Sequence, residues 1–347
     1  MKPNAFLRRH WQKRPLFVRQ AMPGFRGAMD LRSLLALAAR PDTESRRVQR
    51  RSAEWETRHG PFPEQLRLKA RNDSLLVSGV NLHVAAADAL LREFAFIPQA
   101  RLDDVMVSYA TPGGGVGPHV DSYDVFLLQG AGRRRWRFWP PGKPRKDAMT
   151  EVLARAGDLL YLPPGWLHDG VALDPCFTYS IGFRAPRGAE LAAAFLDWLH
   201  ERGLPDAPYR DPRLVAAAHP GAIPANLRAF AKRILDGISW SGADVLDFLG
   251  RYLTEPKAHV VFRPSRAGRS LERSCLRLDP KTQFLYCGRR FFINGESFSA
   301  AAGAGALREL ADRRSLAGRR LASHPLSGLV SQWLRAGYAH LEKPPKR

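Results

Sequence analysis

Three side chains of this 347-residue chain have the types and spacing that bind a transition metal. His119 and Asp121 lie two residues apart in the segment GGGVGPHVDSYDVFLLQ. Residues i and i+2 of a strand point to the same face, so the imidazole and the carboxylate converge on one point. A lone pair of this kind is weak evidence, because most such pairs are surface or hydrogen-bonding groups. The surrounding sequence must therefore decide whether the pair binds metal.

A further histidine follows in the segment GDLLYLPPGWLHDG, where an apolar run leads into a PPGW turn and then His168. In a rolled β-structure this turn brings the imidazole to the open end of the barrel, opposite the first pair. Two histidines and one carboxylate form the facial triad that suits non-haem Fe(II), and the open positions accept a bidentate 2-oxo acid and O₂. Alternatively, His168 only caps a loop beside Asp169.

The run GRRRWRFW predicts a buried cation near this metal site. Strand alternation places Arg134, Trp136 and Phe138 on one face, and hydrophobic burial makes the aromatic face the inner one. A buried guanidinium needs an anion, since an unpaired charge there costs several kcal/mol. The distal carboxylate of 2-oxoglutarate would supply it through a bidentate salt bridge. The alternative is that this face looks outward and the arginines are solvated.

Two neighbouring segments are expected to border the same site. Ser108 shares a strand face with Met106 in VMVSY and offers a hydroxyl to 2-oxoglutarate, although simple structural filling is an open alternative. The glycine run 113–117 lacks the Lys-Ser/Thr of a phosphate loop, so we interpret it as a flexible turn at the mouth of the site.

The elements that position these residues divide the chain into three parts. Residues 1–186 combine a helical, aromatic opening with short β-branched runs separated by Gly and Pro, which indicates a sandwich or barrel. Residues 187–255 predict three amphipathic helices that form a small bundle, used either as core or for self-association. Residues 256–347 contain the hairpin signal Asn294-Gly295 between helices, which resembles a winged-helix module.

Composition and charge limit the classes of function. Lys and Arg total 54 against 33 Asp and Glu, so the net charge is +21. Such a field attracts polyanions such as ribosomal RNA, unless the arginines are only a solvated surface. No stretch reaches the length of a membrane-spanning helix, and the basic N-terminus lacks a following apolar run, so a cytoplasmic protein is expected. The three cysteines have no CxxC spacing and predict neither disulfides nor a zinc-thiolate site.

These motifs together resemble the JmjC oxygenases, and more narrowly the bacterial ribosomal oxygenases that hydroxylate an arginine of large-subunit ribosomal protein L-sixteen. The resemblance runs nearly the whole chain and is carried by FLRRHWQKRPL, HGPF, DDVMVSYATPGGGVGPHVDSYDVFLLQGAGRRRW, GDLLYLPPGWLHDG and YSIGFRAP. It implies a mixed α and β protein with a double-stranded β-helix of the JmjC/cupin type, a helical dimerisation region and a C-terminal winged-helix-like domain. A homodimer is therefore expected.

The resemblance also implies the roles of individual residues. By motif match, His119, Asp121 and His168 hold Fe(II), while Arg134 and Ser108 bind 2-oxoglutarate, with O₂ as the second cosubstrate. An arginine substrate needs carboxylates and aromatic surfaces near the iron.

Two residues just beyond the ligands offer such groups, Tyr123 and Asp124 of HVDSYD. Residues two apart along a strand share a face, so Tyr123 lies on the inner face with His119 and Asp121. The same alternation places Asp124 on the outer face.

Three other interpretations stay open at this point. A histidine of a ribosomal protein is the target in related eukaryotic ribosomal oxygenases. The barrel would be catalytically idle if a basic, nucleic-acid-binding winged helix did the work. A cupin isomerase or dioxygenase acting on a small molecule would need neither an inward Arg134 nor the extra domains. The net charge of +21 opposes the approach of a basic protein substrate unless acidic patches or RNA intervene.

Overall fold

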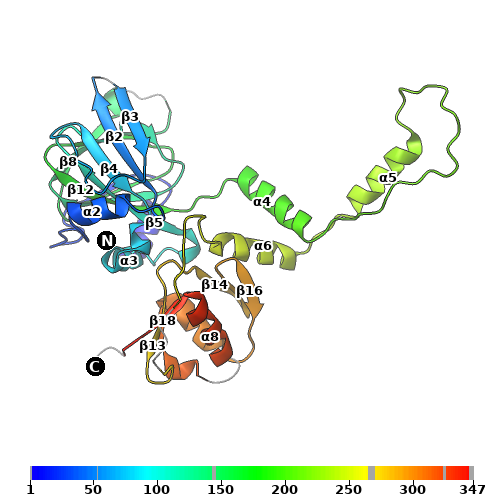
Figure 1. The fold of residues 1–347 in the computed structure, drawn as a ribbon. Coiled ribbons are helices and arrows are strands. Elements are labelled where there is room, and N and C mark those ends of the chain that lie inside the picture. Colours follow the sequence, from blue (N-terminus) through cyan, green and yellow to red (C-terminus); the bar gives the residue numbers. More distant parts are fainter. Residues whose placement is uncertain (1, 53, 143–145, 265–269, 323–325, 344–347) are drawn as a thin grey trace.

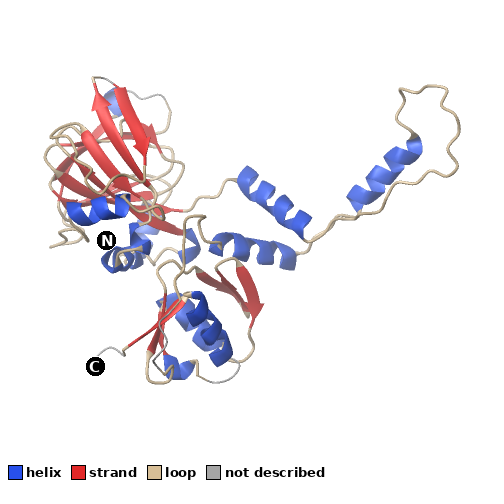
Figure 2. Ribbon diagram, in the orientation of Figure 1, coloured by secondary structure: helices blue, strands red, loops and turns tan. Residues whose placement is uncertain are grey.

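The computed structural model describes residues 2–52, 54–142, 146–264, 270–322 and 326–343. Figure 1 shows three parts in chain order: a β-barrel with helices on one side, a helical segment that reaches away from it, and a smaller C-terminal domain. Figure 2 shows that strands dominate the first part, helices the second, and that the third is mixed.

The barrel consists of two antiparallel sheets. The major sheet has the strand order β1-β10-β7-β12-β5-β4-β2-β3, and the minor sheet has the order β6-β11-β8-β9. The major sheet contains β1 (Leu16–Val18), β2 (Ser45–Arg51), β3 (Glu54–His59), β4 (Asp73–Val77), β5 (Leu102–Ala110), β7 (Val125–Ala131), β10 (Leu159–Leu162) and β12 (Cys176–Phe183). The minor sheet contains β6 (His119–Val120), β8 (Arg133–Trp139), β9 (Thr150–Arg155) and β11 (Leu167–Ala172).

Alternation along the major sheet gives it two different faces. On β5, Val105 and Val107 are fully buried in the hydrophobic core, while Asp104, Met106 and Ser108 line a cavity between the two sheets. This is the period-2 pattern of a strand with both faces covered. One face therefore stabilises the fold, and the other is free to carry polar side chains.

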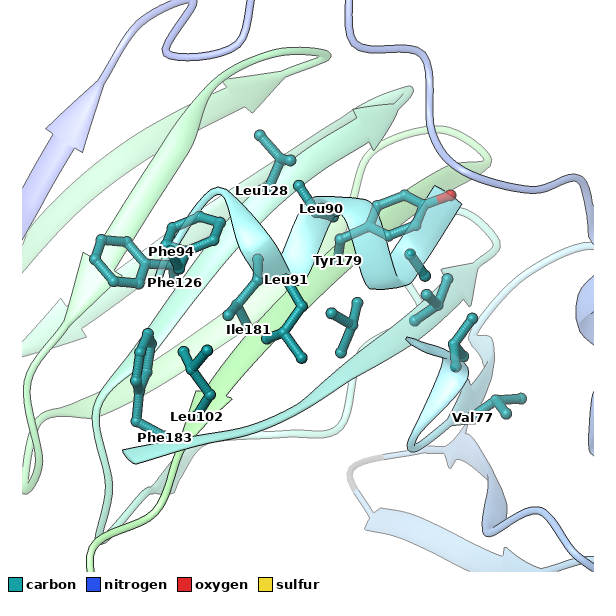
Figure 3. Packing of buried hydrophobic residues seen from close by; sticks show 14 of the residues in the cluster. Val77, Leu90, Leu91, Phe94, Leu102, Phe126, Leu128, Tyr179, Ile181 and Phe183 are labelled. Atoms are coloured by element: carbon teal, nitrogen blue, oxygen red, sulfur yellow. The ribbon is translucent and has the colours of Figure 1, made fainter. Parts of the chain in front are cut away.

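Helices cover the outer face of the major sheet. They are α1 (Pro3–Arg9), α2 (Leu31–Ala38) and α3 (Ala85–Arg92). Asp30 caps α2 by accepting a hydrogen bond from the Ser33 N–H, and the helix buries Leu34 and Leu37. Figure 3 shows side chains of α3 and of the strands gathered into this core. Each fully buried Leu or Phe contributes about 1.5–3 kcal/mol, so this layer makes the sheet a firm support for the cavity.

A second, smaller core closes the barrel between the sheets. Leu127 and Leu160 of the major sheet pack there with Trp136 and Phe138 of β8. The inward face predicted for the aromatic residues of GRRRWRFW is thus the face found in the structure.

The helical segment contains α4 (Gly188–Glu201), α5 (Ala225–Asp236) and α6 (Gly242–Thr254). The three predicted helices are present, but the predicted small bundle is wrong. Only α4 and α6 lie side by side, whereas α5 stands apart at the end of a long loop (Figure 1). Neither α4 nor α5 has a buried residue. Phe195 and Trp198 of α4 pack against Phe248 of α6, so one face of α4 is partly covered, whereas α5 is largely exposed within the described part of the chain.

The C-terminal domain is built around two small sheets and two helices. Its elements are β13 (Cys275–Leu278), β14 (Phe284–Cys287), β15 (Arg290–Ile293), β16 (Glu296–Ser299), α7 (Ala304–Arg313), β17 (Ser315–Ala317), α8 (Leu326–Ala336) and β18 (Ala339–Glu342). Asn294 and Gly295 both have positive φ and join β15 to β16 in the predicted two-residue hairpin. Within the described residues, no helix combines the length and apolar character that crossing a bilayer requires.

Candidate functional site

A cavity of about 330 Å³ opens between the two sheets of the barrel. The major sheet contributes side chains from β4, β5, β7 and β12, and the minor sheet contributes them from β6, β8 and β11. The predicted site residues on its wall are Ser108, His119, Asp121, Tyr123, Arg134 and His168. The fold therefore brings together residues that lie up to sixty positions apart in the sequence.

The three predicted metal ligands converge at this cavity. Nε2 of His168 lies 3.7 Å from Asp121 Oδ2, and Nε2 of His119 lies 3.9 Å from Asp121 Oδ1. The register of β6 and β11 places His119 directly opposite His168. One ligand atom from each residue lies within 4.8 Å of the others, which fits a single ion between them. The donor set of two imidazoles and one carboxylate is the type that holds non-haem iron.

Backbone carbonyls fix the orientation of both imidazoles. Nδ1 of His119 lies 3.0 Å from the Gly117 carbonyl oxygen, and Nδ1 of His168 lies 3.0 Å from the Trp166 carbonyl oxygen. A carbonyl oxygen only accepts, so each Nδ1 carries the proton and donates it. Each Nε2 is then left with a free lone pair directed at the shared point, as a metal ligand requires.

The electrostatics of the site favour a neutral His168. Burial lowers the pKa of His168, and the neighbouring His119 lowers it further, while the Trp166 carbonyl and Asp121 act in the opposite direction. The side chain is only 3% exposed. A neutral imidazole is the form that binds metal ions, so this environment prepares His168 for ligation.

Arg134 has the buried, unpaired guanidinium that the strand pattern predicts. It is 6% exposed and lies 5.5 Å from the ring of Trp136. Its Nε and Nη2 atoms are buried and have no hydrogen-bond partner in the structure. Leaving a buried charged group unpaired costs several kcal/mol, so these donors fit an anion that binds in the cavity. The hydroxyl of Ser108, on the wall of the same cavity, is 3.5 Å from the Thr178 carbonyl oxygen.

The two predicted substrate residues have opposite outcomes. Tyr123 lines the cavity, and burial together with the carboxylates of Asp121 and Asp104 raises the pKa of its phenol. Asp124 does not reach the cavity. It is 0% exposed and accepts hydrogen bonds from the Tyr161 hydroxyl at 2.6 Å and the Gln12 side chain at 2.9 Å. Its predicted contact with substrate is wrong, because both oxygens bind groups on the other side of the sheet.

Sequence reasoning missed three charged residues that line the cavity. Two are the carboxylates Asp103 and Asp104 of β5, and the third is Lys257, which follows α6 in the chain. The signal was present, since Asp104 shares the parity of Met106 and Ser108 on β5. The contribution of Lys257 had no local signal, because it depends on how the chain returns to the barrel after the helical segment.

Comparison with known proteins agrees with this geometry. Residues 89–191 match the JmjC domain family, and residues 238–340 match the ROXA-like winged helix. Over 273 residues the chain is 38% identical to the ribosomal protein uL16 3-hydroxylase of Escherichia coli, covering 75% of this chain and 73% of that protein. The chain belongs to the JmjC ribosomal oxygenase family. A probable ribosomal oxygenase of Haemophilus influenzae is also 38% identical, over 54% of this chain and 51% of that protein.

Solved structures of ribosomal oxygenases share the whole fold. The chain matches YcfD, a ribosomal oxygenase from Escherichia coli, with a TM-score of 0.84 and 31% identity over 99% of this chain and 98% of that one. A complex of YcfD with cobalt and 2-oxoglutarate matches with the same TM-score and 30% identity, again over 99% and 98%. The predicted family, barrel and winged-helix-like domain are therefore confirmed.

Membership of the ribosomal oxygenases also confirms the enzyme class and cofactors predicted from the sequence. The chain is a 2-oxoglutarate-dependent oxygenase that uses Fe(II). Two observations of this structure fit these groups: the converging triad fits a divalent metal, and the unpaired donors of Arg134 fit a dicarboxylate. The interpretations as an idle scaffold or a small-molecule cupin enzyme are set aside by this match.

Proposed function

We propose that this chain hydroxylates an arginine side chain of ribosomal protein uL16. The observation that carries the proposal is the 38% identity to a uL16 3-hydroxylase, which covers 75% of this chain. The cavity supports it, because an aromatic ring, Tyr123, and carboxylates that serve no metal line its mouth. A basic side chain is the ligand that such groups attract.

Within this proposal, His119, Asp121 and His168 hold Fe(II), and Arg134 binds 2-oxoglutarate with help from Ser108. When bound, Fe(II) and 2-oxoglutarate supply the oxidising chemistry that inserts one oxygen atom of O₂ into a C–H bond. Arg134 pairs with the distal carboxylate through its two free donors and thereby orients the cosubstrate. The carbonyls of Gly117 and Trp166 keep both imidazoles turned toward the metal position.

The remaining cavity residues position the substrate and limit water. Val125, Leu127 and Trp136 form an apolar wall next to Arg134. This wall lowers the local dielectric constant and strengthens the pairing of Arg134 with a carboxylate. Tyr123 presents its ring beside Asp121, where a substrate side chain must pass to reach the metal position.

A peptide assay tests the substrate. We would incubate the enzyme with Fe(II), 2-oxoglutarate and a uL16 fragment, then locate added oxygen by fragment mass spectrometry. One oxygen atom on an arginine is expected, and none on the same fragment with that arginine replaced by lysine. Oxygen on a histidine, or equally on the lysine version, would exclude the arginine assignment and favour the histidine alternative. Intact masses of ribosomal proteins from cells with and without the gene would test the same target in vivo.

We further propose that the helical region 187–255 forms a homodimer. Of the 16 large hydrophobic residues that are exposed among the described residues, nine lie in this region, including Leu196, Leu235 and Trp240. Apolar side chains at such density are usually covered by a partner. The division into residues 1–186, 187–255 and 256–347 is proposed on the same basis, with the middle part reserved for association.

The proposed substrate also indicates where the enzyme acts, because a bacterial ribosomal protein substrate implies a cytoplasmic enzyme.

The net charge of +21 supports a contact with ribosomal RNA during delivery of the substrate. Such a contact would weaken steeply as salt rises, which filter binding of ribosomal RNA at two ionic strengths would measure.

A further inference from the structure

The edge strand β3 carries one aromatic side chain among polar ones. Trp55 is the only apolar residue of this strand, whose sequence is EWETRH, and β3 is the outermost strand of the major sheet. The side chain is half-buried, yet it belongs to none of the hydrophobic clusters found among the described residues. Its position is therefore explained by contacts outside the cores.

Trp55 packs against the glycine loop 113–117, which leads to His119. A Cβ placed on Gly117 would lie 2.8 Å from Cδ1 and Nε1 of Trp55 and 3.1 Å from its Cγ, so the indole ring lies directly against the Gly117 backbone. A Cβ placed on Gly115 would lie 3.3 Å from Cη2 at the far edge of the same ring. Gly117 has a φ of +83°, which glycine adopts without strain. The indole of Trp55 thus spans the second half of the loop.

The backbone of this second half has little other support. The start of the loop is fixed to β11, because Gly113 and Gly114 exchange hydrogen bonds of 2.8 and 2.9 Å with Ala172. In the described part of the chain, the N–H groups of residues 115–117 have no backbone partner. Glycine loses more conformational freedom on folding than any other residue, so such a segment needs packing to be ordered. Trp55 supplies that packing.

The loop affects the metal site because its last glycine orients a proposed ligand. The Gly117 carbonyl oxygen lies 3.0 Å from Nδ1 of His119. The side chain of His119 is 38% exposed, whereas that of His168 is 3% exposed. Packing therefore confines the ring of His168, while the ring of His119 depends mainly on the Gly117 carbonyl. A displaced loop would turn Nε2 of His119 away from the point that it shares with Asp121 and His168.

We propose that Trp55 is a positioning residue for the metal site, which holds residues 115–117 in place so that the Gly117 carbonyl fixes the ring of His119. The inference rests on the ligand set proposed above. Trp55 itself does not line the cavity, so it acts through the loop and not by touching metal, cosubstrate or substrate. Removal of groups that orient a metal ligand typically weakens metal binding by about 10- to 100-fold. Trp55 acts one step further away, which places its effect at the lower end.

Metal affinity tests this role without turnover. We would titrate the parent, Trp55→Ala and Trp55→Phe with Mn(II) in the absence of 2-oxoglutarate and O₂. Trp55→Ala is expected to weaken Mn(II) binding on the order of 10-fold, because the loop loses its packing. Trp55→Phe should stay within about 3-fold of the parent, because its ring still covers Gly117.

The visible absorption of bound Co(II) supplies a readout that a change in overall stability would not produce. The spectrum depends on the geometry of the donor atoms. At saturating Co(II), Trp55→Ala is expected to alter the spectrum, and Trp55→Phe to restore it. The matched control is Arg50→Ala, which removes the guanidinium that lies 5.6 Å from the Trp55 ring but leaves the indole. It should keep the parent's affinity and spectrum.

His119→Ala, titrated alongside, separates this inference from the ligand set. Loss of Mn(II) binding in His119→Ala, with the parent's affinity and Co(II) spectrum in Trp55→Ala, would overturn the inference and leave the ligand set standing. An equal loss in Arg50→Ala would also overturn it, because the hairpin charge and not the ring would then control the site. The parent's affinity in His119→Ala would refute the ligand set, and the inference with it.

Thermal unfolding guards against a general loss of structure. If Trp55→Ala melts more than about 5 °C below the parent, Trp55→Leu takes its place. Leucine keeps an apolar side chain on the strand but presents no flat ring to Gly117. For the inference to stand, Trp55→Leu must then show the same weakening of Mn(II) binding and the same change in the Co(II) spectrum.

Discussion

Both histidines of the triad donate Nδ1–H to the carbonyl two residues earlier in the chain, so the same ring nitrogen of each faces the cavity. This arrangement requires no ligand, because backbone geometry alone selects the tautomer. The conformational entropy of the two rings is thus lost during folding and not when metal binds. A metal ion therefore binds three donors that are already oriented.

Replacing any member of the triad should abolish metal-dependent turnover. We expect His119→Ala, Asp121→Ala and His168→Ala each to lower Fe(II)-dependent succinate formation from 2-oxoglutarate by at least about 10²-fold, because two ligands hold iron poorly. The control is His219→Ala, which changes an exposed histidine of the helical region. Turnover close to the parent's in any triad variant would contradict the ligand set.

Substitution of Arg134 should separate cosubstrate binding from metal binding. Arg134→Ala is expected to raise the 2-oxoglutarate concentration needed for half-maximal turnover on the order of 10²-fold, because two charge-assisted hydrogen bonds are lost. Arg134→Lys should recover part of this loss, since it restores the charge but not the planar fork.

Metal affinity, measured directly, should change little in both Arg134 variants. Arg137→Ala, on the same strand but paired with Glu151 on the outer face, provides the control. An unchanged 2-oxoglutarate requirement in Arg134→Ala would show that the guanidinium does not bind the cosubstrate.

Asp124 has a structural role in place of the predicted contact with substrate. The Tyr161 hydroxyl donates to its carboxylate and accepts a 2.8 Å hydrogen bond from the Gln12 N–H, which ties the N-terminal segment to the sheet. We expect Tyr161→Phe to lower the free energy of unfolding by about 1–3 kcal/mol, because it leaves buried groups unpaired.

Chemical denaturation would measure this difference. Tyr109→Phe is the matched control, since its ring packs on Phe177 and its hydroxyl has no hydrogen bond among the described residues. It should change stability by less than about 0.5 kcal/mol. Equal effects of the two variants would argue against a role for the Tyr161 network.

At the scale of the elements, strand alternation explains which predictions succeeded. On β8 the alternation runs without interruption, so Arg134, Trp136 and Phe138 face inward as predicted. Between β6 and β7 the chain leaves the strand at residue 121 and re-enters it at 125. If the alternation of β7 is continued backwards, Val125 faces the cavity, and Asp124 faces the opposite side of the sheet, which helices cover. Whether an outer residue is solvated or buried cannot be decided from alternation, because that depends on what covers the sheet.

The contact between α6 and the β14-β15-β16 sheet supplies a test at this scale. A Cβ at Gly250 would overlap the ring of Phe292, which is buried and has no room to move. Alanine normally stabilises a helix relative to glycine by about 0.5–1 kcal/mol. Here overpacking should dominate, and Gly250→Ala is expected to destabilise the C-terminal domain by about 1–3 kcal/mol.

The same helix offers the matched control for this variant. Gly242 lies in its first turn with no atom near the position of a Cβ. Gly242→Ala should be neutral or stabilising by up to about 1 kcal/mol. Thermal unfolding of both variants would compare them, and a stabilised Gly250→Ala would show that α6 does not pack tightly on the sheet.

At the scale of the whole molecule, the extended helical region predicts a dimer. Light scattering at micromolar concentration should give twice the chain mass of 38.8 kDa. Leu235→Asp, at a position 65% exposed, should produce monomers because it places a charge in the apolar interface. Leu173→Asp, on the exposed surface of the barrel, should leave the dimer intact. A monomeric parent protein would contradict the proposal.

The sequence by itself predicted that His119, Asp121 and His168 converge and that Arg134 faces inward, because both features depend on local spacing or on the period of a single element. The tertiary structure alone decided where Asp124 lies, that α5 stands away from its neighbours, and that Lys257 returns to the mouth of the cavity beside Asp103. These features depend on which surfaces meet after folding. Such contacts join residues far apart in the chain, and no local pattern encodes the partner of a side chain.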